Sequence, residues 1–172
     1  MKGLVIKSTG TSYGVHFEDG TTAECHVKGN FRIKGIKSTN PVAVGDRVSF
    51  EVMTDGIGWI TDIEERKNYI IRRPANLSKQ LHIIASNVDQ LMLIVTVNHP
   101  ETSTVFIDRV LATAEAYQVP ATVVINKIDL YTAEELDYMK ALTVLYESIG
   151  YEVVSISAKR GTNVDKLLSM LK

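Results

Sequence analysis

Short runs of apolar residues, broken by turn residues, follow one another along the first third of the chain. This pattern is typical of short β-strands, which are predicted at 4–6, 13–17, 21–27, 47–53 and 59–63. Asp19-Gly20 marks a tight hairpin, because glycine supplies the positive φ that a two-residue turn needs. Five short strands with one long connection, 28–45, predict a small closed barrel of the OB type, with an SH3-like barrel as the alternative.

The hydrophobic pattern changes near residue 64. Residues 64–85 have no clear period and contain Arg72-Arg73-Pro74, which is typical of a linker or a hinge. Residues 88–97 form a near-continuous apolar run, as expected of a strand covered on both faces. Two further apolar strands are predicted at 121–125 and 153–156.

Helices are predicted after each of these three strands. In the first, over 103–118, helical spacing selects an inner stripe of Phe106, Val110, Ala114 and Tyr117. Thr132 and Glu135 form a capping box for the second helix. Thr162 with Asp165 is expected to cap the third. Strands that alternate with helices predict a parallel sheet with right-handed crossovers.

These patterns divide the 172 residues into a barrel domain, 1–65, a basic linker, 66–86, and an α/β domain, 87–172. The composition is that of a globular protein, with 45% hydrophobic residues, 23% charged residues and a net charge of −1, so any basic surface must be local. The start of the chain does not resemble a signal peptide, and no apolar run is long enough to cross a bilayer. We therefore expect a cytoplasmic protein without a membrane partner.

The cysteine, the aromatic residues and the histidines of the sequence give little indication of a catalytic or metal site. Cys25 is the only cysteine, which excludes an intrachain disulfide, and we expect a buried, inert thiol. Tyr13 and Trp59 lie in strand-like patterns and are expected to fill the barrel. The histidines share no metal-ligand spacing and are expected in turns or on the surface; they are His16, His26, His82 and His99.

Two short motifs stand where the second and third strands of the α/β domain end. They are Asn126-Lys127-Ile128-Asp129 and Ser157-Ala158-Lys159. Ligands of open parallel sheets bind beyond the carboxyl ends of the strands. A carboxylate at Asp129 can accept hydrogen bonds from both N1–H and the exocyclic amine of guanine. Adenine offers neither in that geometry, so rejection of ATP can reach roughly four orders of magnitude.

The other residues of the two motifs suit the same base. Asn126 would hold the loop and contact the purine edge, and the stem of Lys127 would lie along the ring. The backbone N–H of Ala158 would meet guanine O6, while Lys159 would cover the other side of the base. Ordinary turn chemistry also explains Asn and Asp after a strand. The second motif, at the matching place in the fold, favours guanine recognition.

The chain resembles the circularly permuted, ribosome small-subunit-dependent GTPases (the RsgA, or YjeQ, family) over its whole length. The matching residues are Val44-Gly45-Asp46-Arg47-Val48, Arg72-Arg73-Pro74, Asn87-Val88-Asp89-Gln90, Ile107-Asp108-Arg109, Asn126-Lys127-Ile128-Asp129-Leu130 and Ser157-Ala158-Lys159. The resemblance implies an all-β OB-fold barrel followed by an α/β P-loop-type GTPase domain, in which the guanine motifs precede the phosphate loop. It also implies GTP hydrolysis stimulated by the 30S subunit, contact between the barrel and 16S rRNA, and a role late in small-subunit maturation.

The phosphate-binding part of the family pattern does not occur in these residues. No glycine begins Gly-x-x-x-x-Gly-Lys-[Ser/Thr], and the switch segments and zinc ligands are absent too. We therefore expect an incomplete GTPase domain of three parallel strands, in an expressed or proteolytic piece of the family protein. The piece should bind GTP or GDP, hold no catalytic residue and hydrolyse no GTP. The resemblance implies Mg²⁺ and Zn²⁺ only in the complete protein.

The incomplete sheet leads to an expectation about association. In the usual GTPase sheet, the phosphate-loop strand pairs beside 88–97, and without it this apolar edge is open to another chain. We expect the piece to self-associate or swap segments there, and the intact protein to be monomeric.

Two acid-free basic stretches, one in the long loop and one in the linker, are candidate RNA contacts. Their residues are Lys28, Phe31, Arg32, Lys34, Lys37, Arg72, Arg73 and Lys79. Basic side chains beside an aromatic ring suit phosphate contact and base stacking, although a solvated loop explains the same residues equally well. The family resemblance favours RNA contact. The alternative function is a non-enzymatic OB-fold rRNA-binding module, in which the α/β half only supports the barrel.

Overall fold

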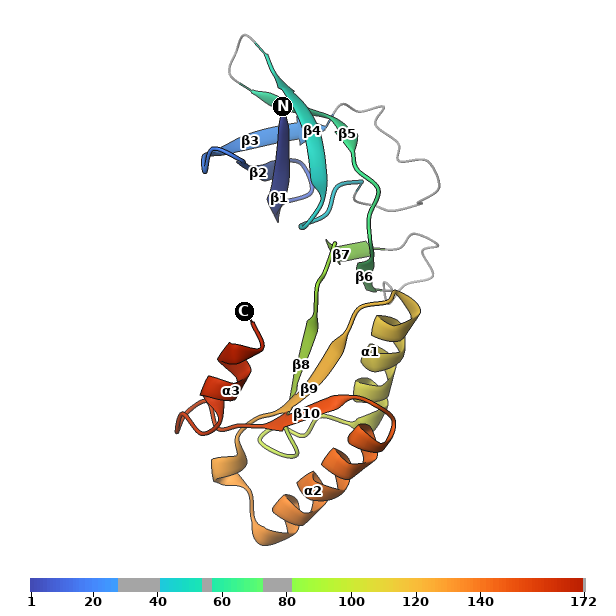
Figure 1. Ribbon diagram of the computed structural model, residues 1–172, viewed down its shortest axis with the longest axis vertical. Helices are drawn as coiled ribbons and strands as arrows, with labels where there is room; N and C mark the ends of the chain where they lie inside the picture. The colour runs from blue at the N-terminus through green and yellow to red at the C-terminus, as the bar shows by residue number, and fades with distance from the viewer. Residues whose placement is uncertain (28–40, 54–56, 73–81, 172) are drawn as a thin grey trace. The chain divides into compact units, whose positions relative to one another are not determined.

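The structure is a computed structural model that describes residues 1–27, 41–53, 57–72 and 82–171 (Figure 1). The chain divides into two compact units, Met1–Val88 and Asp89–Lys172. Each unit has its own hydrophobic core, and each is described by itself.

The first unit is built around a five-stranded closed barrel with the strand order β1-β2-β3-β5-β4. The strands are β1 (Lys2–Ser8), β2 (Tyr13–Phe17), β3 (Thr22–Val27), β4 (Arg47–Val52) and β5 (Gly58–Ile63). Strands β3 and β5 pair in parallel and close the barrel, which confirms the OB-type prediction. Gly20 has a φ of +85° in the β2–β3 turn, as Asp19-Gly20 predicts.

The interior of the barrel confirms two residue predictions and contradicts a third. Cys25 and Tyr13 lie in its core, and burial raises the pKa of the Cys25 thiol. The prediction for Trp59 was wrong. Its neighbour Ile60 points inward, and because side chains alternate along a strand, Trp59 lies on the outer face beside His26, at a ring-centroid distance of 5.8 Å.

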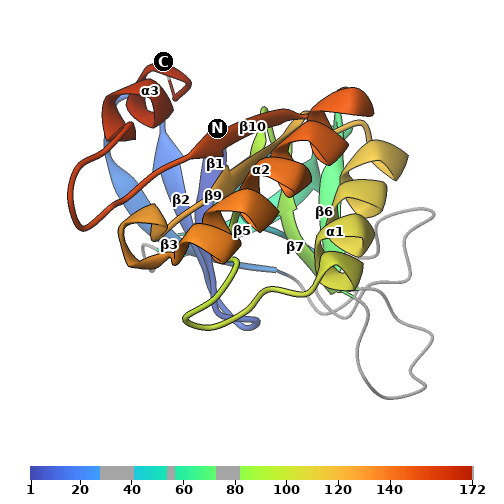
Figure 2. The same cartoon turned by 90° about the horizontal axis from the view of Figure 1, so that it is seen from below.

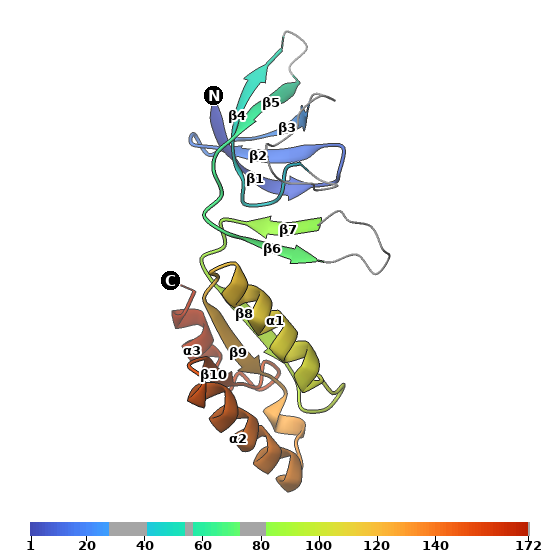
Figure 3. The same ribbon diagram turned by 90° about the vertical axis from the view of Figure 1, so that its right-hand side faces the viewer.

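The stretch without a clear period contains two short strands. These are β6 (Tyr69–Arg72) and β7 (His82–Ser86), which form an antiparallel pair. The pair lies next to the barrel in the same unit (Figure 3), where Val44 and Ala85 form a parallel bridge. The segment after the barrel is therefore not a plain linker between two folded parts.

A buried ion pair fixes β7 and the end of the barrel to each other. The carboxylate of Asp46, fully buried, accepts hydrogen bonds from Arg66 Nε at 2.7 Å and Nη2 at 2.6 Å. It also accepts from Ser86 Oγ at 2.5 Å and from the backbone N–H of Ala43 at 2.8 Å. Next to it, Gly45 has a φ of +93°, and a Cβ there would lie 2.0 Å from the Ser86 carbonyl oxygen. This close approach requires glycine.

The second unit is a three-stranded parallel sheet with the order β10-β9-β8. The strands are β8 (Leu91–Val95), β9 (Ala121–Ile125) and β10 (Glu152–Ser155), and the helices are α1 (Thr104–Ala116), the 3₁₀ turn η1 (Ile128–Leu130), α2 (Ala133–Ser148) and α3 (Val164–Ser169). This confirms the predicted alternation of strands and helices. Among the described residues, no helix is long and apolar enough to span a bilayer.

Helices pack on both faces of this sheet, as the apolar strands predict. One face packs on α1 and α2, which lie side by side in Figure 2, through a core that includes Leu93, Val95, Val123, Ile125 and Val153. The opposite face packs on α3 through Val124, Val154 and Ile156 with Leu167 and Met170. In β9 and β10, neighbouring residues therefore pack against different helices.

The inner stripe of α1 differs from the predicted one. The buried residues are Ile107, Leu111 and Ala114, whereas Phe106 is 52% exposed. Both stripes have helical spacing. Ala114 is buried as predicted and Val110 packs against the core, but Ile107 rather than Phe106 begins the buried stripe.

The predicted capping box of α2 is confirmed, but the cap of α3 is not. Thr132 Oγ1 accepts from the Glu135 N–H, and Glu135 Oε2 accepts from the Thr132 N–H at 2.8 Å. Helix α3 follows Asn163, which has a left-handed φ of 57°. Thr162 forms a β-bridge with Ser157, so its backbone belongs to the preceding loop.

Strand β8 lies at an edge of the described sheet. Its residue Ile94 is 60% exposed, so the edge strand presents apolar surface. Self-association across this edge stays a prediction.

Arg66→Met tests the buried ion pair. Loss of the guanidinium leaves Asp46 buried without its charged partner, so we expect a loss of about 3–5 kcal/mol in the free energy of unfolding. Urea denaturation followed by fluorescence measures it in this unit, because Trp59 is the only tryptophan. Lys2→Met is the control, since it breaks the exposed Lys2–Glu64 pair and should change little. Equal losses in the two variants would contradict the assignment.

Candidate functional site

The two sequence motifs meet at one edge of the parallel sheet. Strands β9 and β10 pair in register, with Ile125 opposite Ser155, and each motif begins within two residues of these positions. The backbone N–H of Ile128 donates to the Ile156 carbonyl at 3.3 Å, which continues the contact beyond the strands.

Asn126 connects the two motifs through one side-chain oxygen. Its Oδ1 accepts from the backbone N–H of Lys127 at 2.7 Å and from that of Ala158 at 3.1 Å. Within the described residues its amide nitrogen donates no hydrogen bond, so this donor is free for a ligand. Its own backbone N–H donates to the Val95 carbonyl at 2.8 Å, which holds the loop to β8.

Lys127 has a left-handed backbone with a φ of 68°. Its Nζ donates to the carbonyl oxygen of His99, in the loop after β8. The side chain therefore reaches from its own loop to the loop after β8, and the residue is half-buried. This placement is compatible with a stem that lies along a flat ring.

Asp129 and Ser157 join the motifs a second time. The buried Ser157 hydroxyl donates to Asp129 Oδ1 at 2.5 Å and accepts from the Arg160 N–H at 3.0 Å. The hydrogen bond from Ser157 holds the pKa of the Asp129 carboxyl below its ordinary value of 3.8, and the charges of Arg160 and Lys159 act in the same direction. Asp129 is therefore an ionised acceptor at neutral pH.

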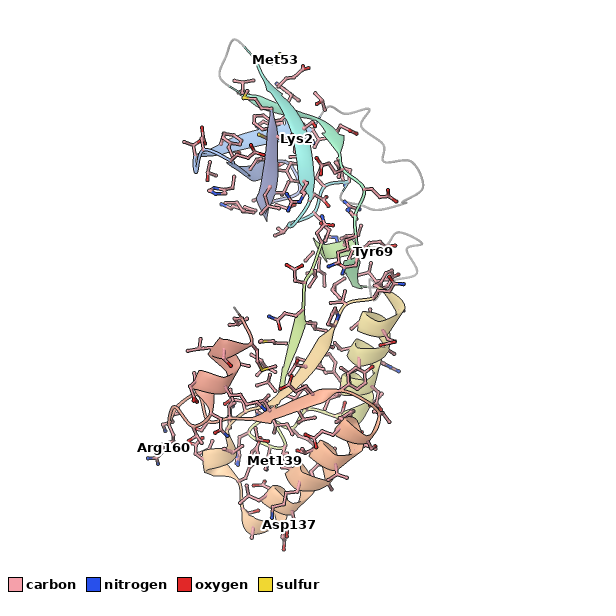
Figure 4. All side chains as sticks on the ribbon, viewed as in Figure 1. Lys2, Met53, Tyr69, Asp137, Met139 and Arg160 are labelled. Atoms are coloured by element: carbon pink, nitrogen blue, oxygen red, sulfur yellow. The ribbon has the colours of Figure 1, made fainter. Side chains whose placement is uncertain are left out.

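The rim of the site is basic and open to solvent. Ala158, Lys159 and Arg160 are all exposed, and Figure 4 labels Arg160 in the loop between β10 and α3. Asp129 is only half-buried, so its second oxygen can be reached by a ligand. The structure thus places the seven predicted guanine-site residues in two adjoining loops.

We did not predict from the sequence that the loop after β8 forms hydrogen bonds with the segment that follows β9. Val97 N–H donates to the hydroxyl of Tyr131 at 2.9 Å, and Asn98 Nδ2 donates to Glu135 Oε1 at 2.7 Å. The polar residues Asn98 and His99, which follow an apolar strand at the same sheet edge, were the signal for it. No pattern in the sequence indicated the role of the Tyr131 hydroxyl.

The candidate RNA contacts fall mostly outside the described residues. Arg72 is the last residue of β6. The others lie outside the described ranges: Lys28, Phe31, Arg32, Lys34, Lys37, Arg73 and Lys79. In the part of the chain that the structure describes, no group of three or more His, Cys, Asp or Glu side chains is placed to hold a metal ion.

Each of the two units matches the model of a known protein family. The model of the RsgA N-terminal domain matches residues 2–60, and the model of the RsgA GTPase matches residues 63–172. The chain belongs to the RsgA GTPase family. The expected family resemblance is thereby confirmed over nearly the whole chain.

Named relatives and solved structures agree with this assignment to the RsgA family. A protein of Bacteroides thetaiotaomicron named small ribosomal subunit biogenesis GTPase RsgA 2 is 61% identical over 97% of this chain, and its RsgA counterpart in Bacteroides fragilis is 59% identical over all of it. The crystal structure of YjeQ from Thermotoga maritima matches with a TM-score of 0.75 at 34% identity over 99% of this chain. YloQ, described as a circularly permuted GTPase, matches with a TM-score of 0.67 at 30% identity, also over 99%.

The match covers only part of each relative. The chain spans 54% and 56% of the two Bacteroides proteins, 56% of the YjeQ chain and 55% of the YloQ chain. It therefore spans about half the length of the relatives it matches.

Ser157→Ala tests the cause of the low Asp129 pKa. Loss of the hydroxyl donor should raise the pKa of Asp129 toward 3.8, as measured by NMR titration of its carboxyl carbon. Because the folded pKa is the lowered one, the stabilisation from this bond is present above pH 3.8 and is lost as the pH falls through the folded value. Asp19, whose pKa is lowered by Thr21, should not change. A Ser157→Ala protein with an unchanged Asp129 pKa would refute the assignment.

Proposed function

We propose that this chain reads the base of a guanine nucleotide through the loops after β9 and β10. The observation that carries the proposal is the ionised Asp129, held by Ser157 next to the Asn126–Ala158 contact. A carboxylate in this position matches the two adjacent donors of guanine, N1–H and the exocyclic amine. Adenine has no such pair of donors, so it would leave the carboxylate unsatisfied.

The remaining residues are assigned to the faces and the far edge of the base. The stem of Lys127 would lie along one face of the ring, and Lys159 would cover the other. The Ala158 N–H, which donates to Asn126 Oδ1, is the donor that we assign to guanine O6, shared with or released from that bond. The free amide nitrogen of Asn126 would contact the purine edge. The hydrogen bonds from Lys127 and Ala158 to Asn126 Oδ1 support these assignments, because they bring the two loops together.

We further propose that the protein is a GTPase of small-subunit assembly that binds GTP and GDP. The support is membership of the RsgA family and the names of its relatives. In this proposal GTP hydrolysis, with Mg²⁺ on the phosphates, needs groups outside these 172 residues. The 30S subunit with its 16S rRNA is the proposed partner, and the cytoplasm is the proposed location.

The barrel is the proposed RNA-binding part. Its support is the OB-type closure, the match to the RsgA N-terminal domain and the basic loop residues of the sequence. Basic residues beside an aromatic side chain would contact phosphates and stack on an unpaired base.

Asp129→Asn tests base recognition. The amide keeps one acceptor but places a donor where guanine also donates, so GDP affinity should fall on the order of a hundredfold or more. Affinity for xanthosine diphosphate should rise, since xanthine has a carbonyl in place of the exocyclic amine. Competition against a fluorescent GDP measures both, with ADP as the reference.

The matched control is Asp137→Asn on the exposed face of α2, labelled in Figure 4, where Asp137 pairs with Lys140. It makes the same chemical change away from the site and should leave GDP affinity unaltered. An Asp129→Asn protein that keeps its guanine preference would refute the proposal. A wild-type protein without any guanine preference would favour the RNA-binding module instead.

Lys34→Glu with Lys37→Glu tests the RNA contact, although both residues lie outside the described ranges. The variant should bind the 30S subunit more weakly, with a flatter dependence on salt, because fewer phosphate charges are neutralised. Filter binding at several salt concentrations measures this. Lys140→Glu with Lys166→Glu makes the same charge change in the other unit and serves as the control. Equal binding by the two double variants would count against a loop-specific contact.

A further inference from the structure

Three consecutive residues after β8 are each tied to the segment that would read guanine. Val97 N–H donates to the Tyr131 hydroxyl, and Asn98 Nδ2 donates to Glu135 Oε1. The carbonyl oxygen of His99 accepts from Lys127 Nζ. The loop after β8 is thus connected to 126–135 at three points within one compact unit.

Tyr131 makes the most buried of these connections. Its hydroxyl accepts from Val97 N–H at 2.9 Å and donates to the Asn126 carbonyl at 2.5 Å. The residue is only 9% exposed, and its ring belongs to the hydrophobic core beneath the sheet edge. Burial raises the pKa of the Tyr131 hydroxyl, so it remains a donor at physiological pH.

The backbone of Asn126 is therefore held through both its N–H and its carbonyl group. Its N–H donates to the Val95 carbonyl at 2.8 Å, while its carbonyl accepts from Tyr131. The side chain that extends from this fixed backbone reaches Ala158 in the second loop. A shift of the Asn126 backbone would move both loops, because the Ala158 contact depends on it.

We propose that Tyr131 is a positioning residue of the guanine site, whose hydroxyl clamps the Asn126 loop to the end of β8. The bond from Asn98 to Glu135 is a second, exposed tie between the same elements. Glu135 also closes the capping box of α2, so the start of that helix is fixed with the loop. This role rests on the proposed guanine recognition.

A purely structural role for the hydroxyl is the competing explanation, and the chain offers a matched control. Tyr146 is 1% exposed, and its hydroxyl donates to Asp108 Oδ1 at 3.0 Å between α2 and α1. It lies near the other end of α2 from the guanine loop. Tyr146→Phe deletes one hydrogen bond of a buried tyrosine hydroxyl without touching the site, whereas Tyr131→Phe deletes two, one to Val97 and one to Asn126.

The experiment compares wild type, Tyr131→Phe and Tyr146→Phe in the protein expressed from its complete gene. Melting temperatures and dissociation constants for fluorescent GDP, with ADP as competitor, are measured for each. Both variants should melt at lower temperature, because each loses hydrogen bonding of a buried tyrosine hydroxyl. The loss should be larger in Tyr131→Phe, which leaves the buried Val97 N–H without its partner, than in Tyr146→Phe, where the exposed Asp108 can bind water instead. Only Tyr131→Phe should bind GDP more weakly, by about tenfold, mainly through faster dissociation.

The outcomes separate this inference from the proposed function. Equal GDP affinity in Tyr131→Phe and Tyr146→Phe overturns the positioning role and leaves guanine recognition standing. A wild-type protein that binds ADP as tightly as GDP overturns the proposed function itself. If Tyr131→Phe is too unstable to assay, Asn98→Ala cuts the exposed tie and should weaken GDP binding about twofold. Unchanged binding by that variant then overturns the inference.

Discussion

One side-chain oxygen, Oδ1 of Asn126, accepts hydrogen bonds within its own loop and from Ala158 in a second loop, 32 residues further along the sequence. It can accept from both Lys127 and Ala158 only because β9 and β10 are parallel and in register. The register itself is fixed by burial. Val123, Ile125 and Val153 pack on α1 and α2, whereas Val124 and Val154 pack on α3, so a slip of one residue would exchange the two faces. The polar site is thus a consequence of the hydrophobic sheet beneath it.

Local and strongly periodic signals made much of the second unit predictable. The strand predicted at 121–125 coincides with β9, and the capping box of α2 forms as expected, because both depend on a few neighbouring residues. The inner stripe of α1 was right for Ala114 and wrong for Phe106, since apolar residues at neighbouring positions left the choice to tertiary packing. The bridge between Thr162 and Ser157, which decides where α3 begins, likewise depends on a contact that helix capping rules do not contain.

The first unit was predictable in its strands but not in what joins them. Alternation and an Asp-Gly turn gave five strands, whereas β6 and β7 carry no regular pattern. Their attachment to the barrel relies on Asp46, Arg66 and Ser86, which are polar residues that a sequence assigns to the surface by default. The same limit explains the Tyr131 hydroxyl. A buried polar contact between residues that are distant in the sequence produces no periodic pattern from which it could be predicted.

The exposure of Asp129 bears on how the proposed site would achieve specificity. A carboxylate buried before the ligand arrives needs a permanent charged partner, as Asp46 has in Arg66. Such a partner at Asp129 would compete with the base for the same oxygens. Instead, one oxygen takes a neutral hydroxyl donor, and the cations Lys159 and Arg160 stand at an exposed rim, where water screens them. The acceptor is therefore fixed in direction and ionised, yet its second oxygen is left for the ligand. Selectivity in this arrangement comes from the alignment of donors and acceptors, and every group that aligns Asn126, Asp129 and Ser157 belongs to the same compact unit.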